Sequence, residues 1–119
     1  MAINLNYLIN LTPHAITIAH KSGVKTIIPP SGKVARVKTS DRVVAVALQG
    51  IEIVATTIDG IDGIDGLPAG AEIIVSSMVL DNLPSNCPYE AYAPDTGATA
   101  IRNADGQIEA VTRLRTRVR

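Results

Sequence analysis

The chain has 119 residues, enough for one domain that buries about two thirds of its unfolded surface and too few for a second domain. Its apolar residues are mostly small or branched, with three Tyr and no Phe or Trp, which favours sheets and argues against an aromatic platform for single-stranded nucleic acid. The formal net charge is zero, so no overall field steers the protein toward a charged partner.

The sequence also lacks the signals of secretion and membrane insertion. Cys87 is the only cysteine, so no internal disulfide can form. The first residues have neither the basic start nor the continuous apolar core of a signal peptide, and no run approaches the ~20 apolar residues that cross a bilayer. We therefore expect a soluble, non-secreted protein that does not bind membranes.

The N-terminal third predicts short strands. Residues 3–11 alternate polar and apolar side chains at the period of a half-buried strand, which Thr12-Pro13 interrupts. The runs 15–19 and 24–28 flank residues typical of a turn, so they predict a hairpin.

A second hairpin is predicted in the next third. Residues 33–38 alternate basic and apolar side chains, and Thr39-Ser40-Asp41 interrupts the pattern. The runs 43–48 and 51–57 then surround Gln49-Gly50, where glycine can adopt a positive φ.

The tripeptide Ile-Asp-Gly occurs three times between residues 58 and 66. A period of three fits neither a strand nor a helix, so the sequence predicts an exposed loop. Asp59, Asp62 and Asp65 are oxygen ligands of the kind Ca²⁺ accepts, but their spacing is not that of an EF-hand. A solvated loop is the preferred interpretation, with cation binding left open.

The strongest local pattern lies between residues 66 and 84. Residues 71–75 predict a strand buried on both faces, followed by a short helix capped by Ser76 or Ser77 and ended before Pro84. Residues 84–97 contain three prolines and predict irregular coil. The runs 98–101 and 107–114 surround a turn with Asp-Gly and predict a final hairpin.

Together these elements predict a mainly β fold, a sandwich or partly open barrel of short antiparallel strands with one short helix. We expect one domain over residues 1–112 and a basic extension over residues 113–119. In that extension, alternate positions place four guanidinium groups on one edge of an extended chain, as a candidate contact with a partner. These residues are Arg113, Arg115, Arg117 and Arg119.

No set of residues predicts a reaction. Ser76 has no Gly-x-Ser-x-Gly context, and neither His14 nor His20 has a third metal ligand at a matching spacing. We therefore expect no enzyme activity, no metal and no cofactor. An alternative is a pocket for a phosphate-bearing ligand, in which backbone N–H groups at the helix start hold the phosphate and the fold brings polar and basic side chains to it. These are His14, Ser31, Arg36, Ser76 and Arg102.

Several motifs, taken in order, resemble a family of short proteins encoded by tailed bacteriophages, prophages and bacteria. The main ones are Asn10-Leu11-Thr12-Pro13-His14, Pro29-Pro30-Ser31-Gly32, Ile74-Val75-Ser76-Ser77 and Ala93-Pro94-Asp95-Thr96-Gly97. The likeness spans nearly the whole chain. It implies a viral or mobile-element origin and transfers no catalytic residue. The tripled Ile-Asp-Gly, the Asn86-Cys87-Pro88 region and the arginine-rich end depart from the family's usual form.

Two functional hypotheses follow. The first is a non-enzymatic structural protein of a phage particle, such as a capsid cement or decoration protein, that contacts virion proteins or copies of itself. The second is a small binding module in the host cytoplasm that sequesters a nucleotide-like signal or inhibits a host protein. Neither involves sequence-specific nucleic acid binding.

Overall fold

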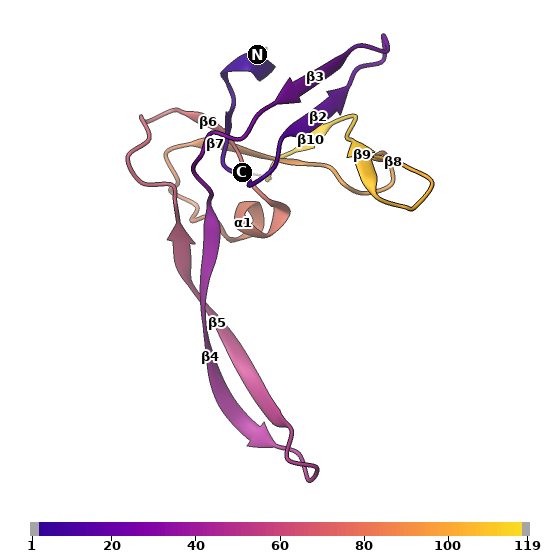
Figure 1. Cartoon of the computed structure of the whole chain (residues 1–119). Coiled ribbons are helices and arrows are strands. Elements are labelled where there is room, and N and C mark those ends of the chain that lie inside the picture. The colour runs from indigo at the N-terminus through magenta and orange to yellow at the C-terminus, as the bar shows by residue number, and fades with distance from the viewer. Residues whose placement is uncertain (1–2, 118–119) are drawn as a thin grey trace.

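The computed structural model describes residues 3–117 as a body from which one long hairpin projects (Figure 1). The hairpin consists of β4 (Arg36–Val46) and β5 (Glu52–Asp62), and we call it the arm. The radius of gyration is 17.3 Å, whereas a compact domain of this length has about 13.5 Å. The fold is mainly β with one short helix, as predicted. The other strands are β1 (Ile9–Asn10), β2 (Ile16–Ala19), β3 (Lys25–Ile28), β6 (Glu72–Ile74), β7 (Glu90–Pro94), β8 (Ile101–Arg102), β9 (Ile108–Ala110) and β10 (Leu114–Arg115).

The body is organised on a four-stranded sheet in the order β1-β6-β7-β10. Strand β6 is central, and Ile73, Ile74 and Val75 are completely buried, which confirms the predicted strand with two buried faces. β6 pairs in parallel with both β1 and β7, while β10 pairs antiparallel with β7. The antiparallel prediction therefore holds for the hairpins but not for these central pairs.

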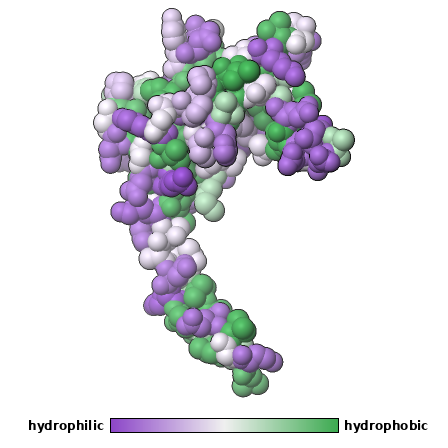
Figure 2. Space-filling model, in the orientation of Figure 1, coloured by the Kyte–Doolittle hydropathy of each residue, from purple (hydrophilic) through white to green (hydrophobic). Residues whose placement is uncertain are grey.

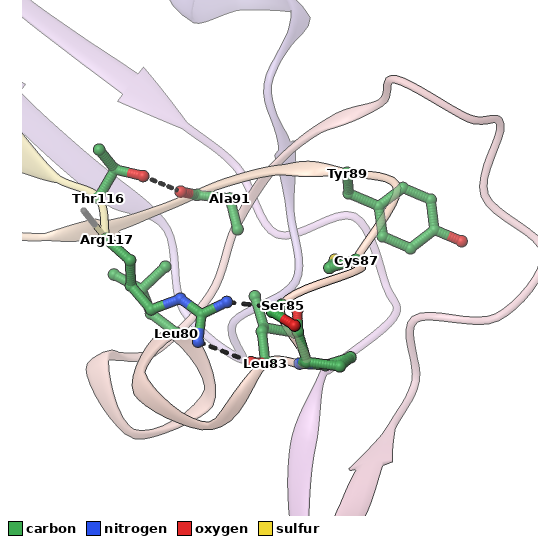
Figure 3. A pocket seen from close by; sticks show the side chains of 9 residues that line it. Leu80, Leu83, Ser85, Cys87, Tyr89, Ala91, Thr116 and Arg117 are labelled. Atoms are coloured by element: carbon green, nitrogen blue, oxygen red, sulfur yellow. Dashed lines mark hydrogen bonds between the residues drawn. The ribbon is translucent and has the colours of Figure 1, made fainter. Parts of the chain in front are cut away.

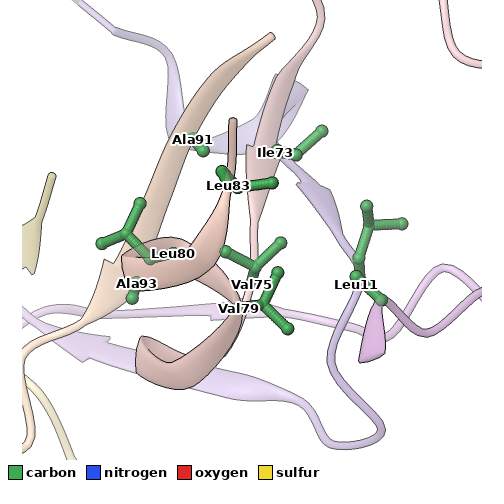
Figure 4. Close-up of a cluster of buried hydrophobic side chains, with 9 residues drawn as sticks. Leu11, Ile73, Val75, Val79, Leu80, Leu83, Ala91 and Ala93 are labelled. Carbon is green, nitrogen blue, oxygen red and sulfur yellow. The ribbon is translucent and has the colours of Figure 1, made fainter. Parts of the chain in front are cut away.

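Helix α1 (Ser77–Asn82) follows β6 directly and covers one face of the sheet. Its N-cap is Ser76, whose hydroxyl accepts a hydrogen bond from the Val79 amide at 3.3 Å. The helix ends at Asn82, and its C-cap Leu83 is in the extended conformation that a following proline favours. Val79, Leu80 and Leu83 pack with residues of β6 and β7 in the larger core cluster (Figure 4).

A second core cluster lies where the β2–β3 hairpin meets the sheet. It contains Leu8, Ile18, Ile28, Ile74 and Val111. Ile18 and Val111 form a parallel bridge, which links β2 to the chain that follows β9. The hairpins β2–β3 and β8–β9 occur where the sequence predicts them, with the last turn at residues 103–107.

The arm consists of β4 (Arg36–Val46) and β5 (Glu52–Asp62), joined at residues 47–51. The predicted hairpin exists but is longer than expected. Thr39-Ser40-Asp41 does not interrupt the first strand, because these residues pair with Ile58, Thr57 and Thr56.

The prediction of an exposed Ile-Asp-Gly loop is wrong for its first half. The first tripeptide and the Ile61-Asp62 pair of the second belong to β5, and Ile61 and Ile64 pack against the larger core cluster. The glycines differ in their surroundings. Both Gly60 and Gly63 have a positive φ. Gly60 lies at a register shift with open space around it, whereas a Cβ on Gly63 would lie 2.1 Å from the Val34 carbonyl oxygen.

Three further expectations are corrected. Residues 5–7 form a 3-10 turn (η1, Leu5–Tyr7), so only Ile9–Asn10 remains of the predicted N-terminal strand. The proline-containing stretch predicted as coil includes β7, because its prolines lie outside or at the end of the strand. The expected basic extension is partly built into the sheet, since Leu114 and Arg115 pair with β7.

Candidate interaction surface

The outer half of the arm, residues 43–54, is the most unusual surface of the molecule, and we call it the outer arm. Of the fifteen exposed large hydrophobic residues within the described range, seven lie there. They are Val43, Val44, Val46, Leu48, Ile51, Ile53 and Val54, and their exposed fractions run from 46% to 103%. Glu52 is the single charged residue in this stretch. Figure 2 shows hydrophobic residues gathered toward the end of the arm, away from the body.

Both faces of the outer arm are apolar. Val43 pairs with Val54 and Ala45 with Ile53, and successive residues of β5 point to opposite faces. Val44 is the extra residue of a register shift between these pairs. An ordinary hairpin on a protein surface buries one face and solvates the other, whereas this segment has no hydrophilic face.

The inner half of the arm is different. It has polar cross-strand contacts, such as the hydrogen bond from the Thr56 hydroxyl to the Asp41 carboxylate at 2.7 Å. Lys38 and Asp62 lie 3.8 Å apart as an exposed ion pair. The change from polar to apolar along one hairpin confines the unusual surface to the end that is farthest from the body.

Water is an unfavourable environment for the outer arm. A two-stranded hairpin is only marginally stable without a third strand or a packed face. Complete burial of a Val, Leu or Ile side chain contributes about 1.5–3 kcal/mol, so the exposed parts of these seven side chains leave roughly 6–13 kcal/mol available to a covering surface. That amount is comparable to the entropic cost of association, about 4–15 kcal/mol.

The five residues of the predicted phosphate pocket are not brought together. Arg36 and Ser76 line one hollow of about 570 Å³ at the base of the arm, together with Pro13 and Met78. Ser31 lines a different hollow. Arg102 lies in the β8–β9 hairpin, where its guanidinium donates to the carbonyls of Gly106 and Thr96.

The motif Asn10-Leu11-Thr12-Pro13-His14 has a structural role. The Asn10 amide nitrogen donates to the carbonyls of His14 at 2.9 Å and Ile28 at 3.0 Å. Its side-chain oxygen accepts from the amide and the hydroxyl of Thr12, at 2.9 and 2.7 Å. The His14 side chain is exposed, and His14 takes part in this network through its backbone carbonyl. A polar residue between Ile9 and Leu11 was the sequence signal for this buried network.

The C-terminal arginines make contacts within the chain. Arg113 forms an ion pair with Asp95, and Arg115 one with Asp81 at 2.9 Å. Arg117 donates to the carbonyls of Leu83 at 2.6 Å and Pro84 at 3.4 Å, just after helix α1. Arg119 lies outside the described residues. The arginines that are described therefore fasten the end of the chain to the body, with partly exposed guanidinium groups at Arg113 and Arg115.

The ion pair to Arg113 affects the acid–base behaviour of Asp95. The hydrogen bond from the Arg113 guanidinium lowers the pKa of the Asp95 carboxyl below 3.8, and the Gly97 amide acts in the same direction. Both donors stabilise the carboxylate.

Another hollow, of about 370 Å³, lies between the end of α1 and β7 (Figure 3). Leu80, Leu83, Cys87, Tyr89 and Arg117 contribute to its lining. The Tyr89 hydroxyl donates to the Leu67 carbonyl at 3.4 Å, and the Arg117 guanidinium is directed at backbone carbonyls. Both side chains are thus engaged with backbone carbonyls, and the described lining of this hollow contains no paired acid and base.

Neither a metal cluster nor a spanning helix is present in the part of the chain that is described. Residues 3–117 contain no group of three His, Cys, Asp or Glu side chains arranged to hold a metal ion. Over the same residues, no helix has the length and hydropathy that crossing a bilayer requires.

Comparison with known proteins gives no relative: no family model, no curated protein and no solved structure matches the chain.

Proposed function

We propose that this protein is a non-enzymatic structural protein of a bacteriophage particle, in the role of capsid cement or decoration, and that it acts through the outer arm. The observation that carries the proposal is the two-faced apolar surface of residues 43–54, held away from the body by a polar stem. Exposed apolar surface of this extent marks an interaction site in a soluble protein.

The chemistry of the outer arm supports a protein partner. Residues 43–54 contain no Lys or Arg, so they cannot neutralise the phosphates of nucleic acid or an anionic membrane. They also contain no Trp or Tyr of the kind that anchors a segment at a lipid interface. Apolar side chains of another protein surface are the remaining complement.

The phage assignment rests on the resemblance described above, and the arm suits it. Cement proteins hold neighbouring subunits together, and a long projection reaches a neighbour that the body does not touch. The arginines at the end of the chain are secondary candidates for contact, because Arg113, Arg115 and Arg117 already have partners within the chain.

Mass spectrometry of purified particles tests this proposal. We expect the protein in the mature particle at a stoichiometry related to the capsid lattice, and we expect a Val46→Lys variant to be lost from it. Thr57→Lys, which adds the same charge to the polar inner half, is the control and should be retained. Absence of the unmodified protein from particles would overturn the assignment.

A second function is favoured by one observation. Arg36 and Ser76 share the hollow at the base of the arm, so a phosphate-bearing ligand would meet a guanidinium and a hydroxyl there. In this alternative the protein works in the host cytoplasm and sequesters a nucleotide-like signal or inhibits a host protein. A thermal shift that grows with nucleotide concentration and disappears in Arg36→Gln would support it. No shift across a nucleotide set would reject nucleotide capture.

A further inference from the structure

We infer that the partner of the outer arm is a second copy of this chain, and that two outer arms pack against each other in a symmetric dimer. The inference rests on the proposed function for the role of the arm as a contact surface, and it names the occupant. Four observations lead to it.

The first observation is the amount of exposed surface. The chain exposes 8048 Å², whereas a folded monomer of 12.5 kDa exposes about 6,200 Å². The excess is roughly 1,900 Å². Obligate dimers bury about 2,000–5,000 Å² in total, or roughly 1,000–2,500 Å² from each subunit. The excess therefore matches the share that one subunit of an obligate dimer gives up.

The second observation concerns shape. The outer arm is long, narrow and apolar on two faces, and the other exposed large hydrophobics of the described residues are dispersed over the body and the inner arm. They are Ile3, Tyr7, Val24, Ile27, Ile58, Met78, Ile101 and Ile108. The outer arm of a second copy of the chain matches it in both length and polarity.

The third observation is electrostatic. Glu52 is the only charge among residues 43–54, and the whole chain is formally neutral. Two copies therefore approach without long-range repulsion, and their outer arms meet with at most one like-charged pair of side chains. A surface suited to a charged partner would show several complementary charges, and this one has only Glu52.

The fourth observation is energetic. A two-fold contact uses the same surface of both copies, so one association event buries the apolar side chains of two outer arms. Covering a single arm yields a gain close to the entropic cost of association, as described above. Doubling the buried surface while incurring that cost once makes a stable dimer possible.

The mass of the full chain in solution is the first test, measured by analytical ultracentrifugation over the micromolar range. We expect a dimer whose dissociation constant rises about a hundredfold or more in Val46→Lys, because a charge then enters the contact twice. The introduced ammonium group would face Glu52 across the hairpin, so the arm itself keeps a favourable pair. Thr57→Lys, opposite Ser40 on the inner arm, is the matched control and should remain dimeric.

Cysteine cross-linking gives the second test. In a Cys87→Ser background, Val44→Cys should form a covalent dimer with a short bis-maleimide. Lys21→Cys, on the exposed turn of the β2–β3 hairpin, should not. The inference would be overturned if the native chain were monomeric, or if Val46→Lys had the same solution mass as the native chain. It would also be overturned if Lys21→Cys were cross-linked to the same extent as Val44→Cys.

These outcomes separate the inference from the proposed function. A native chain that is monomeric in solution, but is found in particles and is lost from them as Val46→Lys, overturns the dimer and supports the structural role. A dimer that is sensitive to Val46→Lys, from a protein absent from particles, supports the dimer and overturns the structural role.

Discussion

Replacing Asn10 should be among the most damaging single changes in the body. Its side chain is 1% exposed and makes four hydrogen bonds. In Asn10→Ala the Thr12 hydroxyl still donates to the His14 carbonyl at 2.9 Å, so those two groups keep a partner. The Thr12 amide loses its partner, whereas the Ile28 carbonyl loses one donor but remains in the β2–β3 ladder opposite Ile16.

One buried amide without a partner and one lost hydrogen bond determine the expected size of the effect. The first costs about 1–3 kcal/mol and the second about 0.5–1.5 kcal/mol, so Asn10→Ala should lower the free energy of unfolding by roughly 1.5–4.5 kcal/mol. Domains of this size have about 5–15 kcal/mol in total. Urea unfolding followed by circular dichroism, at one fixed protein concentration, measures the change. Asn6→Ala, at an exposed position, is the control and should stay within about 0.5 kcal/mol.

A second substitution at the same position separates hydrogen bonding from shape. Asn10→Asp keeps the size of the side chain but places an oxygen against the carbonyls of His14 and Ile28. The folded state then disfavours ionisation, so the pKa of this carboxyl rises above its unfolded value of about 3.9. The penalty is absent below that pH and grows as pH rises to the folded pKa. The reasoning would be refuted if Asn10→Ala lowered the free energy of unfolding by less than about 0.5 kcal/mol. It would also be refuted if the stability of Asn10→Asp did not change with pH.

Three further predictions concern the body. Gly63→Ala should cost at least about 2 kcal/mol of unfolding free energy, from its positive φ and its contact with backbone, and a neutral result would contradict this. Leu80→Ala should cost about 2–5 kcal/mol, whereas Met78→Ala, 64% exposed on the same helix, should change the unfolding midpoint little. An NMR titration of Asp95 should give a midpoint below 3.8 that returns toward 3.8 in Arg113→Gln. Because its pKa is depressed, the stabilisation by this carboxylate is present above its unfolded pKa and is lost as pH falls through the folded pKa.

Local signals in the sequence were sufficient for the hairpin turns and for the strand and helix at residues 71–83. The Asn103–Gln107 turn depends on Gly106 at a positive φ, and the helix start depends on the Ser76 cap, so neighbouring residues determine both. Such features follow from short-range chemistry and are readable from a single sequence.

The parallel pairs were not predictable in this way. β1 pairs with β6 across about half of the chain, and nothing within Ile9–Asn10 identifies that partner. Prolines around β7 argued for coil, although the strand uses only Pro94, at its end, where β10 begins its pairing. The choice of partner belongs to tertiary packing, which periodicity does not report.

The candidate surface was missed for a related reason. The two apolar runs around Gln49-Gly50 correctly indicated a hairpin, but a strand pattern does not say whether the apolar side chains are covered. The useful signal was that both members of successive cross-strand pairs are apolar, with one charge in twelve residues. The predicted pocket residues do not line one common hollow: Arg36 and Ser76 share one, Ser31 lines another, and Arg102 lies in the β8–β9 hairpin.

The parallel sheet also sets the order in which the chain can acquire its structure during synthesis. β1 leaves the ribosome first but must wait for β6, and the sheet is complete only when β10 has been made. The arm needs only its own neighbouring residues and can close much earlier, because its loop is short. The outer arm can therefore form before the body that carries it.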